Sequence, residues 1–71
     1  MKEECIIETW GDIENMIKYL RSSLIVELKY VQRHEHKKKL IEIIEIMNAL
    51  VYAIRQYKEL LKRDLYADQS D

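Results

Sequence analysis

The sequence lacks the residues that most often interrupt helices: it has no proline and a single glycine, Gly11. Its one cysteine, Cys5, cannot form a disulfide bond within the chain, which excludes a disulfide scaffold. No apolar run approaches the ~18 residues that a membrane span needs. The start, MKEECIIE, lacks the basic and apolar regions of a secretory signal peptide. We therefore expect a soluble, cytoplasmic protein with no membrane contact.

What the sequence does contain is typical of helices. Of its 71 residues, 48% are apolar and 35% are charged, which is too apolar for a disordered chain. A chain of this length buries only about 60% of its unfolded surface and is marginally stable alone. We expect a single domain whose core is small.

The apolar residues change phase by about half a helical turn between Val31 and Leu40. The first stripe comprises Ile13, Ile17, Leu20, Leu24, Leu28 and Val31. The second stripe comprises Leu40, Ile43, Ile44, Met47, Leu50, Val51, Ile54 and Leu61. In one continuous helix the stripes would point roughly 160° apart, and no single partner could bury both. The sequence therefore predicts an all-α fold, a two-helix antiparallel hairpin.

The expected domain covers residues 1–71, with an N-terminal segment over 1–11, helices over about 12–33 and 37–66, and a polar tail over 67–71. Thr9 or Asp12 can cap the first helix. The N-terminal segment is compatible with a short strand or an early helical turn. Residues 24–31 are rich in β-formers, but their apolar positions continue the helical stripe, which favours a helix.

The turn is expected within residues 33–38, where the phase break and the run Lys37-Lys38-Lys39 favour a reversal. A turn centred near residue 35 would pair Val31 with Leu40, Leu28 with Ile43, Leu24 with Met47, Leu20 with Leu50, Ile17 with Ile54 and Ile13 with Tyr57. Every one of these pairs is apolar on both sides. In the same register Lys58 faces Asp12, with Glu8 one turn away, and we expect Lys58 to pair with one of these acids.

The second helix is apolar over nearly 200°, although an amphipathic surface helix needs little more than ~100°. One heptad seam reads Leu40, Ile44, Met47, Val51, Ile54, Leu61 and Leu65, and another reads Leu40, Ile43, Met47, Leu50, Ile54, Tyr57 and Leu61. One facing helix cannot cover both seams. The residues expected at a dimer or partner interface are Met16, Tyr19, Val26, Tyr30, Ile46, Leu50, Ala53, Tyr57 and Leu60. Two hairpins packed as a four-helix bundle would bury them, so the sequence predicts a homodimer, with a monomer or a different partner protein as the alternatives.

Charge predicts how two hairpins would be oriented. The acidic residues Glu3, Glu4, Glu8, Asp12, Glu14, Asp68 and Asp71 fall at the end that holds both termini. The basic residues Lys29, Arg33, Lys37, Lys38 and Lys39 fall at the turn end. An antiparallel dimer sets basic ends beside acidic ends, whereas a parallel dimer sets like charges together.

No catalytic, phosphate-binding or metal-binding motif stands out, so we expect no enzyme, no cofactor and no metal. His34-Glu35-His36 is the only cluster of metal-ligand types, but its spacing matches no zinc signature and is read as part of a polar turn. Glu27, on the apolar arc of the first helix, fits an interface edge better than a functional acid. Cys5 is expected to be a small apolar filler rather than a nucleophile.

These observations favour a small helical adaptor or regulator that acts by protein–protein contact, such as an accessory protein of a phage, virus or plasmid. The alternative is a nucleic-acid-binding regulator whose turn end contacts phosphates through Lys29, Arg33, Lys37, Lys38 and Lys39. The net charge of −1 is unlike that of a dedicated DNA-binding protein.

Overall fold

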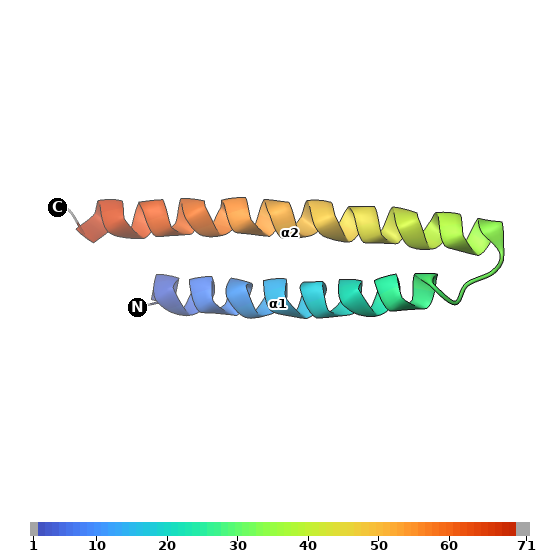
Figure 1. Ribbon diagram of the computed structural model, residues 1–71. Coiled ribbons are helices and arrows are strands. Elements are labelled where there is room, and N and C mark those ends of the chain that lie inside the picture. The colour runs from blue at the N-terminus through green and yellow to red at the C-terminus, as the bar shows by residue number, and fades with distance from the viewer. Residues whose placement is uncertain (1, 70–71) are drawn as a thin grey trace.

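The computed structural model describes the backbone of residues 2–69 and the side chains of residues 4–65. It confirms the all-helical hairpin: α1 (Lys2–Leu28) and α2 (His34–Gln69) pack side by side in opposite directions (Figure 1). The hairpin is a rod of 58 × 15 × 12 Å. It has one layer of two helices, so each helix has only one neighbour against which to bury apolar side chains.

Helix α1 begins ten residues earlier than expected, at Lys2 instead of near residue 12. The segment that was compatible with a strand is helical, and Thr9 is no cap, because its hydroxyl donates to the carbonyl oxygen of Cys5 one turn back, at 2.9 Å. Trp10 accounts for part of this extension. Its ring meets that of Tyr57 edge-on, with centroids 5.6 Å apart, so the early part of α1 packs on α2.

The connection lies at residues 29–33, earlier than the expected turn at 33–38, and α1 ends at Leu28 instead of near residue 33. Backbone N–H groups of Lys29 and Tyr30 donate to the carbonyls three residues before them, which tightens the last turn. Helix α2 starts at His34, and the carbonyl of Arg33 accepts its first bond, from Lys37 N–H at 3.0 Å. The lysine run is therefore helical. Its side chains are exposed, so water screens their mutual repulsion.

Helix α2 is longer than α1 and extends beyond it at both ends (Figure 1). It continues to Gln69, so the tail expected over 67–71 is helical over 67–69, and residues 70–71 lie outside the described part of the chain. At the other end, the first turns of α2 project past the end of α1. Leu40 is the first residue of α2 to be buried.

The core is a single seam. Its most buried apolar residues are Leu40, Val51 and Ile54 on α2. The half-buried seam residues are Ile13, Ile17, Leu24 and Leu28 of α1, Val31 of the connection, and Ile44, Met47, Leu61 and Leu65 of α2. The first of the two predicted heptad seams is thus the one that faces α1. The second is not, because Ile43, Leu50 and Tyr57 are exposed, and so is Leu20, which was expected opposite Leu50.

Candidate interaction surface

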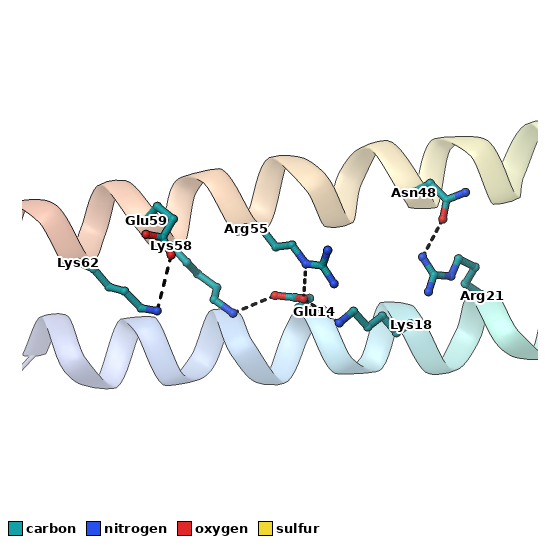
Figure 2. Close-up of polar contacts among 8 residues, drawn as sticks. All are labelled: Glu14, Lys18, Arg21, Asn48, Arg55, Lys58, Glu59 and Lys62. Carbon is teal, nitrogen blue, oxygen red and sulfur yellow. Dashed lines mark hydrogen bonds and ion pairs between the residues drawn. The ribbon is translucent and has the colours of Figure 1, made fainter.

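Among the side chains that the structure describes, Glu14 is the buried charged residue, with 5% of its surface exposed. Its carboxylate accepts hydrogen bonds from Nε of Arg55 and Nζ of Lys58, both at 2.9 Å, and forms an ion pair with Nζ of Lys18 at 3.0 Å (Figure 2). Lys18 lies one turn along α1, whereas Arg55 and Lys58 come from α2. One carboxylate therefore ties the two helices together.

The three cations hold Glu14 in its ionised form. Hydrogen bonds from Lys58, Arg55 and Lys18 lower the pKa of Glu14 from 4.5 to about 2, and they outweigh the opposing effect of its burial. A carboxyl group with so low a pKa is a poor proton donor or acceptor near neutral pH. The arrangement suits a structural contact that fixes the register of the helices, and it is unsuited to general acid–base catalysis.

The partner expected for Lys58 was wrong. Lys58 pairs with Glu14, and neither Asp12 nor Glu8 accepts a hydrogen bond from it. The reason is angular: Asp12 and Glu14 are two residues apart, which places them about 160° apart around α1. Asp12 is exposed on the side of α1 that faces away from α2. The Lys58 side chain therefore extends from the seam to the carboxylate of Glu14, which lies at the border of the seam.

A second polar contact lies on the same side of the seam. Nη1 of Arg21 donates to Oδ1 of Asn48 at 2.7 Å (Figure 2). We call this side the polar flank, and it comprises Glu14, Lys18 and Arg21 of α1 and Asn48, Arg55 and Lys58 of α2. The pairing of residues 14 with 55 and 21 with 48 is close to the register expected from the apolar stripes, and so is the ring contact between residues 10 and 57.

The opposite side of the seam is apolar and exposed. On α1, Met16 and Leu20 lie on the side of the seam away from Glu14; on α2, Ile46 and Leu50 lie on the side away from Arg55. Because the polar groups of the two helices touch one another, both apolar sides face the same way. This apolar flank comprises Met16 and Leu20 of α1 and Ile43, Ile46, Leu50, Ala53, Tyr57 and Leu60 of α2.

The apolar flank brings together most of the residues predicted for an interface. On this flank Met16 and Ile46 are 64% and 67% exposed. Beside them, Asn15, Met16, Tyr19 and Leu20 line an open hollow of about 310 Å³. Three predicted residues lie elsewhere: Tyr19 and Val26, seven residues apart, are exposed further around α1, and Tyr30 belongs to the connection. An exposed apolar flank on two helices is typical of a protein–protein contact surface.

The predicted basic residues gather at one end of the rod. Lys29 and Arg33 belong to the connection, and Lys37, Lys38 and Lys39 to the projecting turns of α2. All five are exposed, and Nζ of Lys39 lies 3.3 Å from a carboxylate oxygen of Glu42. At the opposite end Glu4, Glu8 and Asp12 are exposed, while the side chains of Glu3, Asp68 and Asp71 lie outside the described residues.

The other candidates for chemistry are exposed. His34, Glu35 and His36 form the first turn of α2 instead of a turn between helices, and Glu27 points away from the seam. Among the described residues, no three or more His, Cys, Asp or Glu side chains are grouped to hold a metal ion. Cys5 is exposed, so its expected role as a core filler was wrong.

Sequence reasoning missed Glu14, which it treated as one of several acids near the N-terminus. Two signals pointed to it. Lys58 interrupts an apolar seam and so requires a partner within reach, and Glu14 precedes Lys18 by four residues, the spacing of a helical ion pair. Together they mark a carboxylate at the border of the seam.

Comparison of the chain with protein-family models, curated proteins and solved structures finds no match. Within the described residues, neither helix combines the length and the apolar character that crossing a membrane requires.

Proposed function

We propose that this protein is a small, non-enzymatic cytoplasmic adaptor or regulator that acts by protein–protein contact, and that its working form is a homodimer. The observation that carries the proposal is the apolar flank. A hairpin that confines the polar contacts between its two helices to one side of the seam and exposes large apolar side chains on the other has a surface suited to another helical protein.

The exposed area supports a partner. The hairpin exposes 5943 Å², whereas a compact monomer of 8.6 kDa exposes roughly 4,700 Å². The excess of roughly 1,200 Å² is larger than the ~800 Å² that each partner buries in an interface of standard size. A partner that covers an area of that size would bring the exposed area to a value normal for this mass.

A second copy of the hairpin is a suitable cover. Two rods that face one another through their apolar flanks form a four-helix bundle, in which every helix gains a second neighbour. The polar flanks then lie on the outside of the bundle, in water. The same contact repeated by twofold symmetry accounts for the apolar excess on both helices.

Sedimentation equilibrium of the wild type and two matched variants tests the proposal. Ile46→Glu places a charge on the apolar flank and is expected to convert a dimer of about twice 8.6 kDa to a monomer. Tyr52→Glu places the same charge at a residue that is 63% exposed outside that flank, and it should leave the dimer intact. A wild type that sediments as a monomer, or equal effects of both variants, would rule the proposal out.

A nucleic-acid-binding regulator is the second candidate, favoured by the basic end of the rod. Five exposed cations lie there within one connection and two helical turns, where their side chains can reach phosphates. A gel shift with mixed DNA and RNA distinguishes the candidates. Binding that weakens with salt and is lost on replacing Lys37, Lys38 and Lys39 with glutamate would favour this second function; no shift at low salt would exclude it.

A further inference from the structure

The apolar flank of α2 follows an uninterrupted heptad stripe with a charge at each end. From Lys39 to Asp64 the stripe reads Lys39, Ile43, Ile46, Leu50, Ala53, Tyr57, Leu60 and Asp64, with spacings that alternate between four and three. Helix α2 is continuous through all eight positions, and all eight side chains are exposed. Spacings of this kind keep one side of a helix facing one partner helix.

We propose that this stripe pairs with itself, so that the α2 helices of two copies run antiparallel across the apolar flank in one defined register. The inference rests on the homodimer proposed above and adds its orientation and contacts. A twofold axis between positions 50 and 53 pairs Lys39 with Asp64 of the partner subunit, Ile43 with Leu60 of the partner subunit, Ile46 with Tyr57 of the partner subunit and Leu50 with Ala53 of the partner subunit.

Charge favours this orientation. Each Lys39 meets the partner's Asp64, which gives two opposite-charge pairs, one at each end of the stripe. Both side chains can reach a new partner, because the ion pairs of Lys39 with Glu42 and of Asp64 with Arg63 are exposed and close in sequence. A parallel pairing would instead set Lys39 against Lys39 and Asp64 against Asp64. The basic end of one rod also comes beside the acidic end of the other, where Glu4, Glu8 and Asp12 are exposed.

Side-chain size favours it as well. At the centre of the stripe the large Leu50 lies opposite the small Ala53 of the partner subunit, and the same pair recurs across the axis, so that the two helices interdigitate. A parallel pairing would place two alanines together and leave a void. Helix α1 contributes at the same level: the pairings of residues 14 with 55 and 21 with 48 place Met16 level with Ala53, near the axis.

Pulsed dipolar spectroscopy on spin-labelled full-length chain tests the register. In a Cys5→Ser background, one sample carries a label at Lys38→Cys and another at Gln56→Cys, both exposed and off the stripe. In the proposed register residue 38 lies level with residue 65 of the other copy, so its labels are separated by roughly 40 Å, while those at residue 56 are separated by roughly 20 Å.

The outcomes separate the register from the dimer itself. A long distance at residue 38 together with a short one at residue 56 supports the proposal. Short distances at both sites would mean a parallel dimer, and the register would be wrong although the proposed function stands. The absence of any distance between molecules would overturn the homodimer and the register together.

Charge exchange supplies an independent readout. Lys39→Glu is expected to weaken dimerisation roughly tenfold, because it sets two carboxylates against one another at both ends of the stripe. Adding Asp64→Lys to the same chain should restore dimerisation, while Lys38→Glu, the same charge change off the stripe, should have little effect. Failure of the double variant to recover would contradict the proposed pairing.

Discussion

At the scale of single residues, Glu14 connects the two helices through charge. A carboxylate at the border of the seam accepts from Lys58, Arg55 and Lys18, and two of these three come from the opposite helix. Three cations surround one carboxylate, so positive charge is in excess. Part of that excess is solvated, because the Arg55 side chain is more than half exposed. The contact therefore combines a buried acceptor with donors that remain partly solvated.

Glu14 predicts a specific dependence of stability on pH. Its pKa in the folded protein is about 2, below the ordinary 4.5, so folding favours the ionised form. The stabilisation is complete above about pH 5 and is lost as the pH falls through 4.5 towards 2. Glu14→Gln should therefore melt below the wild type at pH 7, and the gap should narrow between pH 5 and pH 2.

Thermal melts followed by circular dichroism at pH 7, 4 and 2 would measure that gap. Glu59→Gln is the matched control, because its carboxylate is exposed and lies 3.8 Å from Lys62 within the same helix. It should change the melting temperature little at any pH. A Glu14→Gln gap that stays constant from pH 7 to pH 2 would show that the charge of Glu14 is not what stabilises the hairpin.

Gly11 gives a prediction of opposite sign. It lies inside α1, and a Cβ atom added there would have Nζ of Lys58 as its nearest neighbour, at 3.9 Å, which is an ordinary contact. Its φ angle is not positive, so alanine fits the backbone. Gly11→Ala should stabilise the protein by about 0.5–1 kcal/mol, measured by urea unfolding. A loss of stability would mean that the approach of Lys58 requires the glycine.

At the scale of elements, the periodicity of apolar residues predicted the hairpin and its register but not the ends of the helices. The stripes at residues 13–31 and 40–61 are long enough to define faces. The first and last residues of each helix are not marked by any local sequence signal. Residues 2–11 become helical with Trp10 packed on Tyr57, and the connection forms at 29–33 with no glycine or proline to mark it. A contact distant in sequence, Trp10 on Tyr57, accompanies the first, and local backbone hydrogen bonds at residues 29 and 30 accompany the second.

The seam of α2 predicts unequal costs for two similar substitutions. Ile54 is 4% exposed and faces α1, whereas Ile41 lies near the basic end and is 45% exposed. Ile54→Ala should destabilise the protein by roughly 2–4 kcal/mol, because it leaves a cavity in the only seam of the hairpin. Ile41→Ala should cost less than about 1 kcal/mol. Urea unfolding of both variants would check this difference. Equal losses of stability would mean that the side of α2 assigned to the seam is wrong.

The start of α2 lacks a capping side chain. The carbonyl of Arg33 accepts the first helical hydrogen bond, so Arg33 occupies the cap position. Arg33→Ser would supply a hydroxyl to the free N–H groups of the first turn and should stabilise the protein by about 0.5–1 kcal/mol. Arg33→Ala removes the same charge without a hydroxyl, so it should give no such gain. If both variants behave alike in thermal melts, capping is not the cause.

At the scale of the whole molecule, the hairpin is a two-sided rod, with polar contacts between its helices on one side of the seam and exposed apolar side chains on the other. Only three apolar side chains are buried among those described, and a wide apolar flank is exposed. The sequence predicted this excess, because an arc of nearly 200° exceeds what one neighbour can cover. The sequence could not predict that the polar contacts between the helices would lie on one side of the seam. That arrangement depends on which of the two overlapping heptad seams of α2 faces α1.

The central claim is that a second copy completes the fold, and the most direct test is the dependence of thermal unfolding on protein concentration. When folding and dimerisation are coupled, raising the concentration a hundredfold should raise the melting temperature by roughly 5–10 °C, because association stabilises the folded state by mass action. Circular dichroism melts from micromolar to high micromolar concentration would show this rise. A melting temperature that stays constant over the whole range would contradict the account, because it would mean that the hairpin is stable as a monomer.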